Sequence, residues 1–124
     1  MGLKKILVVE DNEDNREILV YRLKHLGSYE ILVASNGREA IETAAQIKPD
    51  LIFMDLKMPV MDGLEATRLL RQSDWGKSLP VIAITALAVD GDREKALDAG
   101  CTDYIPKPIV DYSIIERKVR DLIG

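Results

Sequence analysis

Four of the five apolar runs in this chain lead into polar residues that could do chemistry. Glu10 and Asp11 follow the run 6–9, Asp55 follows 51–54, Thr85 follows 81–84, and Lys107 comes just after 104–105. Two carboxylates about 4 Å apart repel by roughly 4 kcal/mol at an effective dielectric of about 20. If these acids meet, the cluster must hold a proton or bind a cation, and a set of oxygen ligands favours Mg²⁺.

The same residue types suit phosphoryl transfer. An aspartate can act as a nucleophile and form an aspartyl-phosphate. The charge on the transferred group needs a metal and an ammonium to offset it, and a hydroxyl can contact a further phosphate oxygen. Asp55 is the best candidate for the nucleophile because it stands alone at its strand end, with Lys107 and Thr85 as its expected neighbours. This chemistry requires the Asp55 side chain to face the other charged groups and not to be buried.

Each of these residues also has an ordinary structural explanation. An aspartate such as Asp55 commonly caps a turn or helix after a strand. Glu10 and Asp11 could simply begin a helix, since acids favour helix N-termini. Thr85 is β-branched and suits a strand, and Lys107 alone would be a surface lysine. Only their joint placement would favour the chemical interpretation.

That placement depends on the elements between the runs. Most runs are nearly continuous, as in strands buried on both faces. Between them, apolar residues recur at helical spacing. The expected helical faces contain Leu19, Leu23 and Leu26; Ala40, Ile41, Ala44 and Ile47; Leu64, Thr67, Leu69 and Leu70; the charged segment 90–99; and Ile115, Val119 and Leu122. Gly27 is an expected C-cap, Pro49 a helix stop, and Asp62-Gly63 a helix start.

Five strand–helix units in succession predict an α/β fold. It is a doubly wound, five-stranded parallel sheet with helices on both faces and right-handed crossovers. Ligands of such sheets bind at the carboxyl ends of the strands. This rule predicts that Glu10, Asp11, Asp55, Thr85 and Lys107 meet at one edge.

Length and composition narrow the possible classes. We expect residues 1–124 to form one domain without an output domain. A net charge of −4 argues against a nucleic-acid partner, and no apolar stretch approaches the ~20 residues of a membrane helix. The lone Cys101 fits a reducing compartment, so we expect a cytoplasmic protein. With one cysteine and one histidine, His25, a zinc site of these residues is excluded.

Longer motifs resemble the receiver family of two-component signalling over essentially the whole chain. They are Val8-Val9-Glu10-Asp11-Asn12 and the segments 50–59, 61–63, 82–86 and 99–108. The spacing also resembles that family: 44 residues from Asp11 to Asp55, 30 more to Thr85 and 22 more to Lys107. The resemblance implies a flavodoxin-like (βα)5 fold.

The resemblance also implies roles. Asp55 would be the phosphoacceptor, and Asp11, Glu10, Asp55 and the carbonyl of Lys57 would form the site for Mg²⁺, with Mn²⁺ as a possible substitute. The donor would be a sensor histidine kinase or a histidine phosphotransfer protein, and a downstream effector would read the signal. Such a protein catalyses only its own phosphorylation and dephosphorylation. It would be a monomer or a weak homodimer.

Three further residues match the family's switch. Thr85 would move toward the phosphate as Tyr104 turns inward, while Lys107 binds the phosphate. These shifts would repack the surface formed by the fourth helix, the fifth strand and the fifth helix. The bond from Lys107 to Pro108 is usually cis in the family. We also expect the apolar Leu87 to screen the phosphate from water.

Other classes fit less well. A haloacid-dehalogenase-type phosphatase needs a second acid two residues after the nucleophile, where Lys57 stands. A calcium loop beginning at Asp11 needs glycine where Arg16 stands. A receiver-like domain that never accepts phosphate stays an alternative on fold alone. A free-standing regulator, as in chemotaxis, cell-cycle or phototransduction pathways, and a piece of a longer hybrid kinase both stay open.

Overall fold

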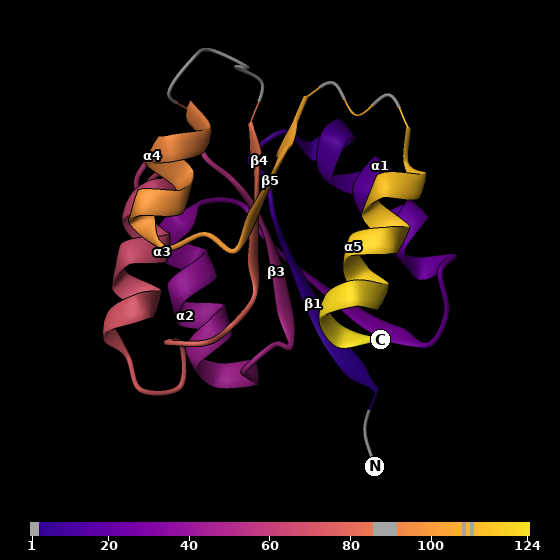
Figure 1. Ribbon diagram of the computed structural model, residues 1–124, viewed down its shortest axis with the longest axis horizontal. Coiled ribbons are helices and arrows are strands. Elements are labelled where there is room, and N and C mark those ends of the chain that lie inside the picture. The colour runs from indigo at the N-terminus through magenta and orange to yellow at the C-terminus, as the bar shows by residue number, and fades with distance from the viewer. Residues whose placement is uncertain (1–2, 86–91, 108, 110) are drawn as a thin grey trace.

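The alternating apolar and amphipathic segments form a parallel sheet covered by helices on both faces (Figure 1). The computed structural model describes residues 3–85, 92–107, 109 and 111–124. The strands are β1 (Lys4–Val9), β2 (Tyr29–Ala34), β3 (Leu51–Asp55), β4 (Val81–Thr85) and β5 (Asp103–Pro106). The helices are α1 (Glu13–Lys24), α2 (Gly37–Ile47), α3 (Gly63–Gln72), α4 (Asp92–Ala99) and α5 (Ser113–Ile123).

The strands pair in the order β2-β1-β3-β4-β5, and every pair is parallel. The helices α1 and α5 cover one face, and α2, α3 and α4 cover the other (Figure 1). Because each connection crosses a face of the sheet, all strands point the same way and their carboxyl ends share one edge. The predicted doubly wound α/β fold is therefore confirmed.

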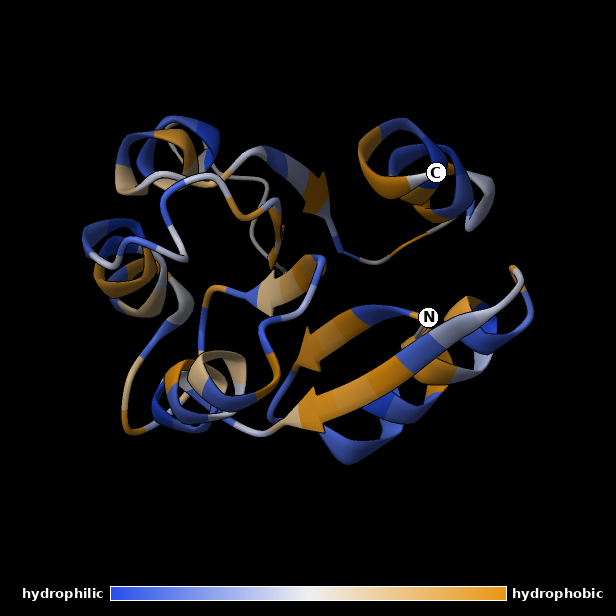
Figure 2. Cartoon of the chain, turned by 90° about the horizontal axis from the view of Figure 1, so that it is seen from below, coloured by the Kyte–Doolittle hydropathy of each residue, from blue (hydrophilic) through white to orange (hydrophobic). Residues whose placement is uncertain are grey.

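Apolar side chains from the sheet fill two core layers. On the α2–α4 face, Leu7, Ile52 and Met54 pack with alanines and leucines of these helices, and on the opposite face Ile6 and Phe53 pack with α1 and α5. Figure 2 shows the apolar colour on the strands and on the inward sides of the helices. Because β1, β3 and β4 are covered on both faces, their apolar runs are continuous.

The edge position of β2 changes its burial. The run 31–33 predicts a strand, and its strand character is confirmed, yet only Ala34 of β2 is buried and Val33 is 49% exposed. An edge strand has one neighbour, so a helix layer covers it incompletely.

Two local predictions were wrong. The helix α1 ends at Lys24 with His25 as its C-cap. The His25 N–H donates to the Arg22 carbonyl and the Leu26 N–H to the Leu23 carbonyl, so the helix is closed before Gly27. On α3, Leu69 is 39% exposed although we placed it on the apolar face. The buried side of α3 is formed instead by its small residues together with Thr67 and Leu70.

Helix starts follow the expected capping chemistry. The Asn12, Asn36 and Asp62 side chains each accept a hydrogen bond from the backbone N–H three residues later, at 2.9 Å. The prediction that Asp62-Gly63 starts a helix is confirmed. The predicted helix 90–99 begins at Asp92 in the structure, and residues 90–91 lie outside the described part. Across the described ranges, no helix combines the length and apolar character that crossing a bilayer requires.

Candidate functional site

The shared carboxyl edge of the sheet collects the residues singled out above. Asp55 is the last residue of β3 and Thr85 the last of β4. Glu10 directly follows β1, and Lys107 directly follows β5. The register aligns Asp55 with Ile84 and Thr85 with Pro106, so these strand ends lie at the same level. Residues up to 97 positions apart therefore form one site.

Three carboxylates converge at this edge. One oxygen each of Glu10, Asp11 and Asp55 lie within 4.8 Å of one another. Glu10 is 4% exposed and Asp55 6% exposed, whereas Asp11 is open to solvent. This arrangement follows from the chain itself, because Glu10 and Asp11 sit between the end of β1 and the Asn12 cap of α1. The donor set consists of oxygen atoms, which suits a hard divalent cation.

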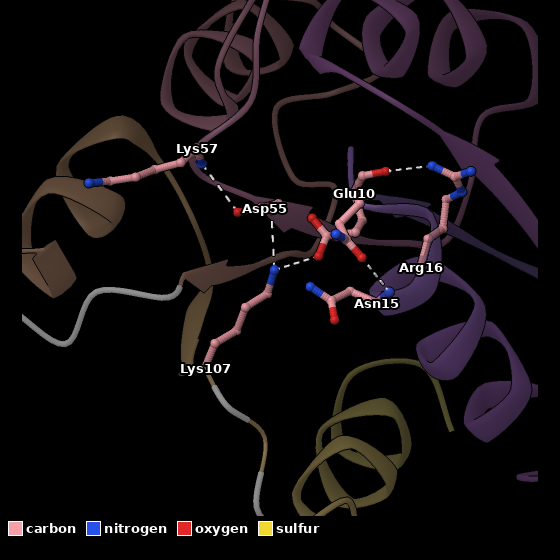
Figure 3. A network of polar contacts seen from close by, with 7 residues as sticks. Glu10, Asn15, Arg16, Asp55, Lys57 and Lys107 are labelled. Carbon is pink, nitrogen blue, oxygen red and sulfur yellow. Dashed lines mark hydrogen bonds and ion pairs between the residues drawn. The ribbon is translucent and has the colours of Figure 1, made fainter.

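Lys107 bridges two of these acids. Its Nζ lies 2.5 Å from Oε1 of Glu10 and 3.4 Å from Oδ2 of Asp55, as Figure 3 shows. The backbone N–H of Lys107 also donates to the Thr85 carbonyl at 2.7 Å, and this bond anchors Lys107 beside the end of β4. Burial works against the ammonium charge, but hydrogen bonding to Glu10 and the charge of Asp55 outweigh it and raise the pKa of Lys107. The lysine is therefore held as a cation.

The environment of Glu10 disfavours its charged form. Burial is the main cause of its raised pKa, the nearby Asp55 carboxylate raises it further, and Lys107 acts in the opposite direction. Within the described residues, no hydrogen-bond donor reaches Oε2 of Glu10, although this atom is buried. A buried carboxylate oxygen without a partner is costly. Its chemistry fits a cation, or a water bound to one, as the missing partner.

Asp55 itself is more enclosed than we expected. Its side chain is only 9% exposed, so the expectation that it would not be buried was wrong. It does face Glu10 and Lys107 as predicted. The end of a central strand lies between its neighbours, and the Lys107 side chain reaches over it; this is the reason for its low exposure. The requirement that Asp55 not be buried was too strict, because a group that covers it is the Lys107 ammonium. A reactant must therefore approach past this lysine.

The backbone after Asp55 turns sharply. The Lys57 N–H donates to Oδ1 of Asp55 at 3.2 Å, and the Lys57 side chain extends away from the acids (Figure 3). Further on, Met61 N–H bonds to the Pro59 carbonyl at 2.8 Å around Val60, whose φ is +69°. This three-residue turn is a strained conformation for a β-branched residue.

The two switch candidates lie nearby. Thr85 is buried at the end of β4, and Tyr104 is partly buried against the core layer on the α2–α4 face. Their roles concern a change between two states and stay predictions. Leu87 and Pro108, on which two further predictions fall, lie outside the described residues.

Sequence reasoning missed two supporting contacts. The Nη1 of Arg16 donates to the Glu10 carbonyl at 2.9 Å, linking α1 to the acidic loop. The Gly37 N–H donates to the Met61 carbonyl at 2.8 Å, linking α2 to the loop after Asp55. A glycine directly after the Asn36 cap was the available signal, since glycine there costs helix stability unless space demands it.

The family model for the response regulator receiver domain matches residues 6–118. The chain belongs to the receiver domain family. This receiver is 42% identical over 113 residues to the polar-differentiation response regulator DivK of Brucella anthropi, covering 91% of each chain. It is also 49% identical over 107 residues to the hybrid signal transduction histidine kinase G of Dictyostelium discoideum; the match covers 85% of this chain and 3% of the kinase.

Solved structures agree with the sequence relatives. The receiver domain of the sensor histidine kinase PA1611 from Pseudomonas aeruginosa has a TM-score of 0.90 and 38% identity, with 99% of both chains covered. That structure has a magnesium ion coordinated in its active site cleft. The Vibrio cholerae chemotaxis protein CheY4 has a TM-score of 0.89 and 26% identity, covering 98% of this chain and all of that one. The predicted family and its flavodoxin-like fold are confirmed.

Proposed function

We propose that this receiver is a phosphoaccepting response regulator in which Asp55 takes up the phosphoryl group in a Mg²⁺-dependent step. The observation that carries the proposal is the position of the Lys107 ammonium between Glu10 and Asp55, with the Asp11 carboxylate in the same cluster. A cation beside a nucleophilic carboxylate and two further acids is the charge pattern that phosphoryl transfer requires. The donor would be a sensor histidine kinase or a histidine phosphotransfer protein.

The residues of this chain divide the work. An oxygen of Asp55 forms the new bond to phosphorus while the bond from phosphorus to the donor nitrogen breaks, and the electron pair stays with the imidazole, which takes a proton. Lys107 leaves its contact with Oδ2 of Asp55 for an oxygen of the arriving group, whose charge it offsets. Thr85, at the end of the adjacent strand, would donate its hydroxyl to another phosphate oxygen.

The residues present fit a Mg²⁺ site. Asp11, Asp55 and the Lys57 carbonyl would be protein ligands, and Glu10, whose Oε2 is buried without a described partner, would bind the ion or its water. Mg²⁺ commonly binds through one or two carboxylates and keeps waters that phosphate oxygens can replace. When bound, it would offset the charge of the carboxylates and of the transferred group. Mn²⁺ would fit the same oxygen ligands.

Signalling would follow from a change of surface. Phosphorylation adds charge and acceptor oxygens beside Thr85. Movement of Thr85 and Tyr104 would then repack the surface of α4, β5 and α5, which an effector protein would recognise. The exposed face of α4 is charged, with Arg93, Glu94 and Lys95 open to solvent. We propose no enzymatic role beyond the protein's own phosphorylation and dephosphorylation.

The wider context belongs to the same proposal. Residues 1–124 would act as one receiver unit, as a monomer or a weak homodimer, with proteins as partners. The net charge of −4 disfavours nucleic acid as a partner. The buried free thiol of Cys101 suits a reducing, cytoplasmic environment.

The test is incubation with acetyl phosphate and Mg²⁺, followed by mass spectrometry of the intact protein. We expect the mass of one phosphoryl group to be added to the native protein and to Asp50→Asn, but not to Asp55→Asn. Asp50 is a matched control because it is an exposed aspartate directly before the same strand. Omission of Mg²⁺ should abolish the gain. Equal labelling of Asp55→Asn, or no labelling of the native protein, would overturn the proposal.

A further inference from the structure

The loop between β3 and α3 holds a conformation that its own sequence does not favour. Val60 has a φ of +69° and is 75% exposed, so no burial of its side chain compensates for the backbone strain. A sparsely populated backbone conformation of this kind costs about 1–3 kcal/mol, and such strain persists only where the surrounding structure imposes it. The loop must therefore be held from outside.

One external attachment comes from the first residue of α2. The Gly37 N–H donates a 2.8 Å hydrogen bond to the Met61 carbonyl, directly after the strained residue. The first N–H groups of a helix have no partner within the helix, and they carry its positive end. The Gly37 N–H, which has no acceptor within α2, thus holds the Met61 carbonyl of the β3–α3 loop, 24 residues further along the sequence.

The approach of the two segments depends on the absence of a side chain. A Cβ added to the buried Gly37 would overlap the carbonyl oxygens of Met61 and Asp62, which are backbone atoms. The loop would have to move away from α2 to make room. Asp62 is also the N-cap of α3, so that the loop cannot move without disturbing the start of this helix.

We propose that Gly37 is a positioning residue for the metal site: it sets the loop that carries the Lys57 carbonyl. The inference rests on the proposed function, since it concerns the same Mg²⁺ site. Gly37 lies outside the acidic cluster and acts through Met61, four residues after Lys57. The backbone N–H of Lys57 holds the near end of the loop through Asp55, and the Gly63 N–H ties the far end to the Leu56 carbonyl at 3.1 Å. Gly37 holds Met61, between these two attachments.

The first test compares Gly37→Ala with Gly76→Ala by Mn²⁺ titration, read by electron paramagnetic resonance. Gly76 is a matched control: it is buried, and a Cβ there would overlap the Leu70 carbonyl, but it lies between α3 and the amino end of β4. Both variants should lose stability in urea. We expect Gly37→Ala alone to weaken Mn²⁺ binding roughly tenfold, as loss of an outer support of a metal site does.

The second test needs no variant. If the held loop favours the ion, then by linkage the bound ion must favour the held loop. Hydrogen exchange of the Gly37 amide in the native protein should therefore slow when Mg²⁺ is added, and exchange of the Gly76 amide should not. This readout stands even if Gly37→Ala does not fold.

The outcomes separate the two proposals. Native protein that binds neither Mg²⁺ nor Mn²⁺ overturns the proposed function and this inference with it. If the native protein binds the ion, two results would each overturn the role of Gly37 and leave the proposed function standing. One is equal Mn²⁺ affinity in the two alanine variants, and the other is hydrogen exchange at Gly37 that Mg²⁺ does not change.

Discussion

The Nζ of Lys107 lies 3.4 Å from Oδ2 of Asp55, although the two residues are 52 positions apart and their strands are not neighbours. The strand β4 separates β3 from β5, so the lysine must extend across the end of β4. The bond from Lys107 N–H to the Thr85 carbonyl anchors it there. The strand order thus places the ammonium beside the proposed phosphoacceptor.

Lys107→Met should slow phosphorylation by acetyl phosphate without weakening the binding of Mg²⁺. Loss of one charge-stabilising donor typically lowers rates by roughly 100-fold or more. The removed ammonium also contacts Glu10 and Asp55, so its loss leaves these carboxylates free for the ion. Mass spectrometry over time and Mg²⁺ titration measure the two effects. The control is Lys118→Met, which removes a partly buried lysine paired with Asp103 and should be phosphorylated at the native rate. A native rate in Lys107→Met would contradict the role assigned to Lys107.

Glu10→Gln should stabilise the metal-free protein at neutral pH. The raised pKa of Glu10 means that folding disfavours its charged form. The contribution of Glu10 to stability is therefore fully present below its usual value of 4.5 and is lost as the pH rises through the raised folded value. The neutral glutamine avoids this loss, and we expect a gain in stability at pH 7 that vanishes in acid.

Urea unfolding at several pH values, with and without Mg²⁺, measures this effect. The native protein should gain more stability from Mg²⁺ than Glu10→Gln does, since the variant lacks one carboxylate of the cluster. Glu30→Gln, at an exposed glutamate of β2, should change neither quantity. If Glu10→Gln is less stable than the native protein at pH 7, the contact of Glu10 with Lys107 outweighs the burial of its charge and the repulsion by Asp55.

Val60→Gly should raise the free energy of unfolding. Glycine adopts a φ of +69° without steric cost, and the relief of about 1–3 kcal/mol exceeds the ~0.5–1 kcal/mol that its backbone entropy costs. Thermal or urea unfolding measures the difference. Val33→Gly is the matched control, because this exposed valine lies in the regular strand β2 and its replacement should destabilise. Equal destabilisation by both changes would argue against strain at Val60.

Asp103→Asn should remove a pH-dependent part of the stability. Burial would raise the pKa of Asp103, but the Lys118 side chain and the Tyr104 N–H outweigh it and lower the pKa. Its contribution is present above the usual value of 3.8 and is lost as the pH falls through the lowered folded value. The side chain is 40% exposed, so the pair contributes less than about 1 kcal/mol.

The measurement is the stability difference between native protein and Asp103→Asn at neutral pH and in acid. Asparagine keeps an oxygen for the Tyr104 N–H, so the change isolates the charge. The difference should shrink as the pH falls below 3.8. A difference that is constant with pH would assign the effect to packing.

The parts of the fold that could be predicted were those that depend on the pattern of a few neighbouring residues. Continuous apolar runs located the central strands, and Asp62-Gly63 located the start of α3, because burial and capping act over a few residues. Predictions that depended on neighbours were less successful. The exposure of Val33 follows from the edge position of β2, and the exposure of Leu69 follows from the side that α3 presents to the sheet.

The candidate site shows the same division. The sequence alone determined which polar residues follow the strands, and the rule for parallel sheets brought their carboxyl ends together. Only the tertiary structure decided that Glu10 shares Lys107 with Asp55, that Asp55 is largely buried, and that Gly37 holds the loop after it. These contacts join segments as much as 97 residues apart. No local preference encodes them, because they arise from the order of the strands and from the space between packed elements.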